Sequence, residues 1–291
     1  MSATVAGLRR KIDSAKDLQS VVRAMKAQAA ASIEQYDRSV AALGDYHRTV
    51  SLGLGVCIRH GDVVTRPQDH RQRAVLVIVF GSDQGLVGRF NDVVGDLAKT
   101  LIARRPGAAV VWAVGQRVRE RLVDPPFSIA GKFDVPASVD AIAPLVGEIL
   151  VAYEKLQAKG NPTELHLVYN QSAPAVTYQP VTLKLLPLDD AWRAKEAAIA
   201  WPTSGLPELL VADPTTLAAF IREYLFVSLF RACAESLASE NASRLAAMQR
   251  ADKNIDGLLE DLNGSFHRLR QDEIDEELFD VVAGYEALRT E

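Results

Sequence analysis

A glycine-rich stretch, Gly81-Ser-Asp-Gln-Gly-Leu-Val-Gly88, is the first place in the chain to look for chemistry. It follows an apolar run and precedes a predicted helix, where nucleotide-binding folds hold phosphate groups on backbone N–H groups. The spacing matches neither G-x-G-x-x-G nor G-x-x-x-x-G-K-[ST], and the stretch has no lysine to meet phosphates. We therefore interpret the glycines as those of a tight strand-to-helix turn, and predict no nucleotide and no other cofactor.

Histidines and cysteines do not form a site by their spacing. His166 lies within a predicted strand without a cysteine or acidic residue at ligand spacing, and His60 and His70 lie in a polar connection. Cys57 and Cys233 make no disulfide framework. No nucleophile, base and orienting group come together along the chain. We predict no metal, no catalytic residue and a protein that is not an enzyme.

Composition excludes further classes. A hydrophobic content of 48% over 291 residues is enough for a buried core, and a net charge of −4 argues against a general nucleic-acid binder. The longest apolar stretches, such as 74–80 and 225–229, fall far short of the roughly 18 to 20 residues that span a bilayer. No export signal opens the chain. The sequence predicts a soluble protein of a reducing, cytoplasmic-side compartment.

Prolines divide the chain, and its N-terminal part contains none. All 13 lie between Pro67 and Pro214, and proline is the strongest single block to a continuous helix. Apolar or small residues recur mostly three and four apart from Leu8 to Cys57, with polar Gln19 and His47 filling two gaps, which predicts one helix of about 50 residues, or roughly 75 Å. Glycines 44, 53 and 55 predict that this helix frays or stops near residues 52–57.

The C-terminal third has the same design. Asp213-Pro214 is a helix start signal, because aspartate can cap and proline is tolerated at the first helical position. Apolar residues then continue at near-heptad spacing to Leu288. Gly257 and Gly264 each cost about 1 kcal/mol relative to alanine and would permit a bend.

Helices of this length cannot bury their stripes against a small domain, so each needs another helix. We predict that the two proline-free ends wind together as an antiparallel coiled coil that projects from a head. Residues 1–38 carry seven basic and four acidic residues (+3), and residues 251–291 carry four basic and twelve acidic residues (−8), which favours pairing. The alternative to the coiled coil is two ordinary multi-helix regions broken at the glycines. The alternative to charge pairing is a solvated helix face with an acidic tip.

The middle of the chain predicts an α/β domain. Residues 74–80 form a continuous β-branched run, typical of a strand buried on both faces. Pro180 predicts an edge position for the last strand. Strand and helix alternate, which favours an open, mostly parallel sheet. The expected strands are 74–80, 108–114, 165–169 and 176–186, and the expected helices are 91–103, 115–122 and 139–159.

The predicted fold class is therefore α/β, with an antiparallel two-helix coiled coil formed by the N- and C-terminal segments and a Rossmann-like, mostly parallel domain between them. The expected domains are an N-terminal coiled-coil helix at 1–57, the α/β domain at 74–190 and a C-terminal coiled-coil helix at 213–289. This fold suits a coiled-coil scaffold or assembly protein with a non-catalytic head. A Rossmann-type nucleotide-binding enzyme with helical extensions is a further alternative.

Four ordered stretches carry a resemblance to a known family. Residues 8–25 are similar to a basic opening followed by K-x-x-Q-x-[IV]-x-[KR]-A-M, and residues 82–91 to S-D-[RQK]-G-L-C-G-x-F-N. Residues 235–248 are similar to E-x-x-A-S-E-x-x-A-R-x-x-A-M with one small slip, and residues 270–288 to a closing R-Q-x-x-I-x-x-E. Together they span the chain, which resembles the gamma subunit of rotary, F-type ATP synthases.

The resemblance implies a function and partners. In that family the helix pair stands in the central cavity of three catalytic and three non-catalytic subunits, and the α/β head lies next to an epsilon-type subunit and the membrane proteolipid ring. The implied function is the central rotor shaft, which couples ion flow through the membrane sector to ATP synthesis or hydrolysis. The implied partners are the alpha and beta subunits, the epsilon-type subunit and the proteolipid ring, with no nucleic acid. The implied place is peripheral, at the cytoplasmic face of the membrane, without direct insertion.

By matched position, the resemblance also implies six residues that contact other subunits: Arg23, Met25, Glu240, Arg244, Arg270 and Gln271. The last four would contact a loop of the catalytic subunits. The first two would lie where the N-terminal helix meets an acidic lever segment of those subunits. For each residue, the alternative is an ordinary exposed coiled-coil position.

Departures from the family pattern indicate a divergent gamma subunit, such as one of a second, paralogous ATPase. Asp275 stands where members usually have threonine, and residues 252–254 read D-K-N in place of T-D-N. Residues 209–211 are Leu-Leu-Val, where members have aromatic and acidic residues that meet the proteolipid loops. We therefore expect docking to the ring to differ, and the coupling ion can be proton or sodium.

Overall fold

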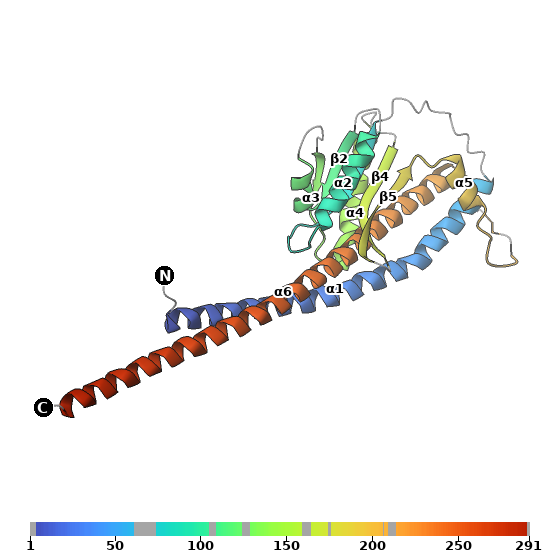
Figure 1. The fold of residues 1–291 in the computed structure, drawn as a ribbon. Helices are drawn as coiled ribbons and strands as arrows, with labels where there is room; N and C mark the ends of the chain where they lie inside the picture. The colour runs from blue at the N-terminus through green and yellow to red at the C-terminus, as the bar shows by residue number, and fades with distance from the viewer. Residues whose placement is uncertain are drawn as a thin grey trace. The chain divides into compact units, whose positions relative to one another are not determined.

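The computed structural model describes residues 4–60, 74–104, 109–123, 129–158, 164–173, 176–205, 207–208 and 214–289. Its contacts divide the chain into two units, the first made of Met1–Ala29 with Leu245–Glu291 and the second of Ala30–Arg244. The elements in chain order (Figure 1) are α1 (Val5–His60), β1 (Val75–Phe80), α2 (Phe90–Ala103), β2 (Ala109–Val114), α3 (Gln116–Arg121), β3 (Ile129–Phe133), the 3-10 turn η2 (Val139–Ala141), α4 (Ile142–Ala158), β4 (Glu164–Ala173), β5 (Val176–Leu186), α5 (Asp190–Ala197) and α6 (Pro214–Arg289).

The second unit contains a five-stranded sheet with the order β3-β2-β1-β4-β5. β1 pairs in parallel with β2 and β4, and β2 pairs in parallel with β3. β5 pairs antiparallel with β4 at the edge, where Pro180 lies opposite Asn170. The predicted mostly parallel sheet, and the edge position of the strand with Pro180, are confirmed.

Alternate residues of the central strands face two different layers. Leu76, Ile78 and Phe80 of β1 belong to a core with residues of α4 and of the parts of α1 and α6 in this unit. Val75, Val77 and Val79 face the opposite way, toward α2 and α3. All six residues of β1 are buried. Because both faces are covered, the strand reads in the sequence as an unbroken apolar run.

α1 continues to His60, so the predicted stop near residues 52–57 is wrong. The two glycines there accommodate neighbours. A Cβ at Gly53 would lie 2.3 Å from the ring of Phe220, and one at Gly55 would lie 2.6 Å from the carbonyl oxygen of Glu196. Close packing by α6 and α5 thus explains glycines that local propensity reads as a helix end.

α6 runs as one helix of 76 residues from Pro214. Gly257 and Gly264 lie inside it, and apart from the adjacent residues and backbone of the helix itself no described atom lies within 4 Å of a Cβ built at either position. The alternative of several helices broken at the glycines is therefore wrong. The predicted cap residue Asp213, the Leu-Leu-Val segment at 209–211 and His70 lie outside the described residues.

Two elements were not predicted from the sequence, β3 and α5. β3 has only Phe133 buried and takes Gly131 where a Cβ would lie 2.5 Å from the Trp112 side chain, so it lacks a strand-like apolar pattern. α5 begins after Asp189, whose Oδ1 accepts a hydrogen bond from the Trp192 N–H at 2.9 Å. Among the described residues, no helix is long and apolar enough to cross a membrane.

Candidate functional site

In the first unit, the N-terminal half of α1 pairs with the C-terminal part of α6 along an apolar seam. Val22, Met248 and Ile255 are buried in that seam, and four further side chains pack against them: Met25, Ala247, Ala251 and Leu259. Gln19 bonds to Asp256, whereas Lys26 bonds to Asp252. Rising numbers on one helix meet falling numbers on the other, so the pair is antiparallel, as predicted.

Polar side chains beside the seam link the two helices at defined positions. Gln19 Nε2 donates to Asp256 Oδ1 at 2.5 Å. Asp252 accepts from Lys26 Nζ at 2.8 Å and from Arg23 Nε at 3.2 Å. The hydrogen bond from Lys26, followed by that from Arg23, lowers the pKa of Asp252. We call Gln19, Arg23, Lys26, Asp252 and Asp256 the polar clamp; it fixes the axial register of the pair, since slippage would separate these partners.

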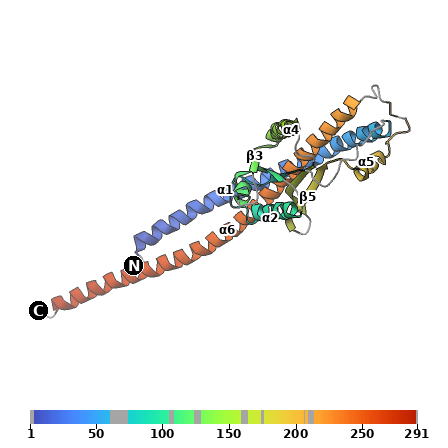
Figure 2. The ribbon, with the colours of Figure 1, turned by 90° about the horizontal axis from the view of Figure 1, so that it is seen from above.

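C-terminal to the polar clamp, α6 has a stretch whose side chains are not buried by other described residues. Every residue from 271 to 285 is exposed. In Figures 1 and 2, this end of α6 extends past the N-terminal end of α1. The stretch still carries large apolar side chains with exposed fractions of 47 to 71%: Ile274, Leu278, Phe279, Val281, Val282 and Tyr285. Apolar surface of this extent on a helix end is typical of a binding surface.

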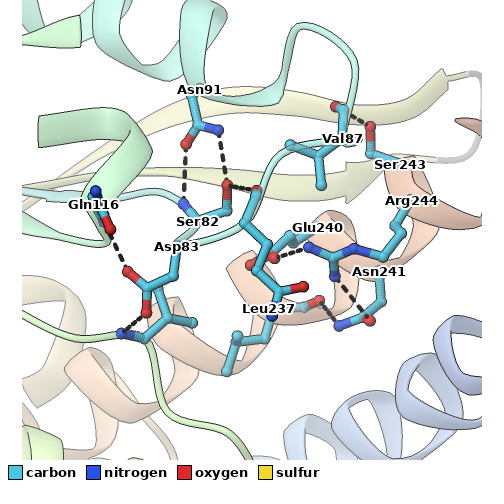
Figure 3. A network of polar contacts seen from close by, with 12 residues as sticks. Ser82, Asp83, Val87, Asn91, Gln116, Leu237, Glu240, Asn241, Ser243 and Arg244 are labelled. Atoms are coloured by element: carbon cyan, nitrogen blue, oxygen red, sulfur yellow. Dashed lines mark hydrogen bonds and ion pairs between the residues drawn. The ribbon is translucent and has the colours of Figure 1, made fainter. Parts of the chain in front are cut away.

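The glycine-rich loop of the second unit follows β1 and is held by its own polar side chains (Figure 3). Asn91 Oδ1 accepts from the Ser82 N–H at 2.9 Å, and Asn91 Nδ2 donates to Ser82 Oγ at 2.8 Å. Asp83 accepts from the N–H of Gln116 at 2.7 Å and from that of Val135 at 2.9 Å. These bonds join the ends of β1, β2 and β3, so the loop is a fixed turn, as its glycines predicted.

An open pocket of about 430 Å³ lies beside this loop, between the starts of α2 and α3. Its two arginines are paired with carboxylates on the same surface. Arg117 bonds to Glu120 at 3.1 Å and Arg121 to Asp92 at 3.4 Å. The pocket therefore offers an anion no uncompensated positive charge among its lining residues.

The loop contacts α6 where the helix carries its third family-like stretch (Figure 3). Ser243 Oγ donates to the carbonyl oxygen of Val87 at 2.6 Å. Beside Ser243 on the same helix, Arg244 Nη2 and Glu240 Oε1, which lie four residues apart, form an ion pair at 2.6 Å in which both side chains are largely buried. Burial, the largest cause, raises the pKa of the Glu240 carboxyl, while Arg244 opposes the shift. We call Ser243, Glu240, Arg244 and the 82–91 loop the loop joint.

The structure places the six implied contact residues in three environments. Arg23 is 57% exposed at its side chain and belongs to the polar clamp, and Met25 is half-buried in the seam. Glu240 and Arg244 lie in the loop joint, bonded to each other. Arg270 and Gln271 are exposed at the start of the uncovered end of α6.

Sequence reasoning missed the residues that bind these positions to the rest of the chain. Asp252, noted as a departure from T-D-N, is the acceptor for Arg23 and Lys26; opposite net charge was the signal, but it does not identify the pair. The reading that His166 has no acidic partner is wrong, because its Nε2 lies 3.2 Å from Glu164 Oε2 on the same face of β4. The described residues hold no cluster of metal-ligating side chains.

Two long helices pair antiparallel in the first unit, and the second unit holds a mostly parallel α/β sheet. These two features define the class of coiled-coil subunits with an α/β domain. A family model described as ATP synthase matches residues 4–288. The ATP synthase gamma chain of Granulibacter bethesdensis is 30% identical over 98% of this chain and all of its own length, and that of Leifsonia xyli subsp. xyli is 29% identical over 99% of each. The chain belongs to the ATP synthase gamma chain family.

Solved structures show the same fold. The rotor of the Euglena gracilis mitochondrial ATP synthase is 16% identical, covers 93% of this chain and 98% of its own, and gives a TM-score of 0.64. The central stalk of the Tetrahymena thermophila mitochondrial ATP synthase is 22% identical, covers 79% of this chain and 99% of its own, and gives a TM-score of 0.55. The likeness extends over both long helices and the sheet, which supports the predicted architecture.

Proposed function

We propose that this chain is the central rotor shaft of an F-type ATP synthase and couples ion flow through the membrane sector to ATP synthesis or hydrolysis. Membership of the gamma chain family makes it a non-catalytic subunit. The observation that carries the proposal is the first unit, in which two helices are fixed in register while the end of α6 is left uncovered. A rotor shaft needs a stiff helix pair that transmits torque and an exposed surface that contacts the surrounding subunits.

The shaft acts by differential contact. Its two helices differ in charge and in length, so a catalytic site facing one side of the pair meets other groups than a site facing the other side. A conformational change is driven only by a difference in interaction free energy between states. Rotation of an asymmetric pair would impose that difference on each catalytic site in turn.

The partners follow from the resemblance to gamma chains. The related structures are described as a rotor, a central stalk with c-ring and an assembly of OSCP, F1 and c-ring. We assign this chain the alpha and beta subunits, an epsilon-type subunit and the membrane proteolipid ring as partners. Its place is peripheral, on the cytoplasmic face of the membrane as part of the complex. The division into domains at 1–57, 74–190 and 213–289 stays a prediction, although α1 itself runs to His60.

The six contact residues support the proposal to different degrees. Arg270 and Gln271 have the exposure that a catalytic-subunit contact requires. Arg23 is exposed, but it forms an ion pair with Asp252, which also pairs with Lys26. An acidic lever segment of a catalytic subunit would therefore contact the polar clamp and not an unpaired arginine. Glu240 and Arg244 would act on a catalytic-subunit loop from within a buried pair.

Co-expression tests the proposal. The tagged chain would be expressed with the alpha and beta subunits of an ATP synthase from the same organism, and we expect a complex of three alpha, three beta and one copy of this chain that hydrolyses ATP and rotates an attached probe. A chain that forms a stable homodimer and recovers no alpha or beta subunit would instead support the scaffold. A large melting shift on adding nucleotide to the isolated chain would support the enzyme.

A further inference from the structure

Three helices of the second unit meet near the end of α1 and the start of α6, where α5 lies against both (Figure 1). The Nε1–H of Trp192 on α5 donates to the Tyr224 hydroxyl of α6 at 3.1 Å, and the two rings pack edge to face at 5.1 Å. Arg59 of α1 donates to the carbonyl oxygens of Ala197 and Ile199 at 2.7 and 3.4 Å. The three-helix junction, as we call it, consists of residues 47–59, 189–199 and 220–231.

α5 is the lightly held member of this junction. Of its eight residues only Glu196 is buried, whereas Leu54 of α1 and Val227 of α6 are inaccessible to solvent. The fit at Glu196 is close, because its carbonyl oxygen lies 2.6 Å from the place of a Cβ at Gly55. An element with few buried side chains opens at a lower cost in free energy than the core around it. α5 can therefore detach while α1 and α6 stay folded.

His47 of α1 faces the junction and is half-buried there. The centroid of its ring lies 6.0 Å from that of Tyr224. Charged groups of both other helices act on it, namely Glu196 and Lys195 of α5 and Arg231 of α6. Burial is the largest cause and lowers the pKa of His47; Glu196 opposes the shift, whereas Arg231 and Lys195 add to it. The closed junction thus suits a neutral imidazole better than a charged one.

The sign of the coupling to pH follows from this lowered pKa. When α5 detaches, His47 regains contact with water and its pKa returns toward the ordinary value of 6.5. The detached state then binds the proton more tightly than the closed state. The stability that His47 gives to the junction is fully present above 6.5 and is lost as pH falls from there through the lowered pKa. A single histidine can shift this equilibrium by at most about tenfold for each pH unit.

We propose that the three-helix junction is a pH-operated latch, in which α5 clasps α1 and α6 while His47 is neutral and detaches when His47 takes up a proton. The inference goes beyond the proposed function and does not depend on it, because all three helices meet within the second unit. Detachment would break the hydrogen bonds that Trp192 and Arg59 make, which are links through α5 between α1 and α6. In a rotor shaft, this end of the helix pair would become less stiff in acid.

Hydrogen exchange at two pH values tests the latch. The full chain would be measured by mass spectrometry, both alone at submicromolar concentration and in complex with alpha and beta. After correction for the intrinsic rate, we expect residues 190–197 to exchange about five- to tenfold faster at pH 5.5 than at pH 7.5. The strand β1 should not change. His47→Gln should abolish the difference, whereas His267→Gln, which alters an exposed histidine of the first unit, should preserve it.

Two neighbouring residues of α5 provide a matched pair of variants. Lys195→Gln removes a positive charge that opposes the protonated ring, so the acid-induced rise in exchange should become smaller. Glu196→Gln removes the carboxylate that favours the protonated ring, so the rise should become larger. A general loss of stability would move both variants in the same direction. Because Lys195 is exposed, its replacement should leave the fold intact.

Four results would overturn the inference. Equal exchange of α5 at the two pH values in the unaltered chain would show that no latch exists. The same rise in His47→Gln would exclude His47 as the group that titrates. A rise shared equally by α5, β1 and α4 would be acid unfolding of the whole second unit. Changes of one sign in Lys195→Gln and Glu196→Gln would exclude the charge of His47 as the cause. Assembly with alpha and beta, which tests the rotor function, is a separate readout from all four.

Discussion

Two regions of one helix, α6, differ in burial. Between residues 227 and 243 almost every side chain is buried against the sheet and α1, including the polar Ser239 and Glu240. Between 271 and 285 every side chain is exposed, including six large apolar ones. Both regions carry large apolar and acidic side chains, but only the first buries them, so the first region serves the chain's own stability and the second is left for partners. The variants below test that division.

The largest effect is expected in the loop joint. Glu240→Ala would leave Arg244 buried without its partner, which should lower the free energy of unfolding of the second unit by about 3 to 5 kcal/mol. Chemical denaturation followed by circular dichroism measures it. The exposed pair Glu34–Arg38 is the control, and Glu34→Gln should cost at most about 1 kcal/mol. Equal losses would show that the burial of Glu240 has no energetic weight.

A core truncation comes next. Leu229→Ala removes a fully buried side chain and should cost about 2 to 5 kcal/mol, whereas Leu278→Ala, 60% exposed, should stay within about 0.5 kcal/mol. Melting temperatures of the two variants give the comparison. If Leu278→Ala destabilised the isolated chain as much as Leu229→Ala, residues near 278 would already be covered by the chain itself.

The polar clamp should make a smaller, pH-dependent contribution. Because Lys26 and Arg23 lower the pKa of Asp252, its share of stability is present above the ordinary value of 3.8 and is lost as pH falls below it through the lowered pKa. Asp252→Asn should abolish that share while keeping the shape. Acid titration of helix content in both proteins measures it, and identical curves would mean that the clamp is not formed in solution.

The smallest effect on the second unit is expected from removing the uncovered end. Truncation after Leu262 should leave the cooperative melting of the sheet domain unchanged, because the sheet residues lie between 75 and 186. It should weaken coupling of hydrolysis to rotation in the assembled complex. Calorimetry reads the first outcome and single-molecule rotation the second, and loss of the calorimetric transition would contradict the division.

The isolated full chain should also aggregate, since its exposed apolar end has no cover of its own. Co-expression with alpha and beta should keep it soluble. Light scattering of the chain with and without its partners checks this. A monodisperse monomer of full helicity would argue that the end needs no partner.

Sequence reasoning found what local patterns encode and failed where distant residues decide. The stripes from Leu8 to Cys57 and along α6, and the run of β1, are properties of single segments, so their elements could be predicted. Gly53 was interpreted as a helix end because the Phe220 ring, whose close approach requires a glycine there, comes from α6 and is distant in the sequence. The charges of the two ends were seen, but the choice of Asp252 as the common acceptor depends on register, which only packing fixes.

The close approach at Gly53 has a mechanical consequence. The Phe220 ring of α6 occupies the space that a Cβ at Gly53 of α1 would fill. If one helix slid along the other by one residue, a side chain would replace Gly53 and clash with that ring. Twisting load on either helix is then resisted by steric exclusion, which neither salt nor pH can weaken.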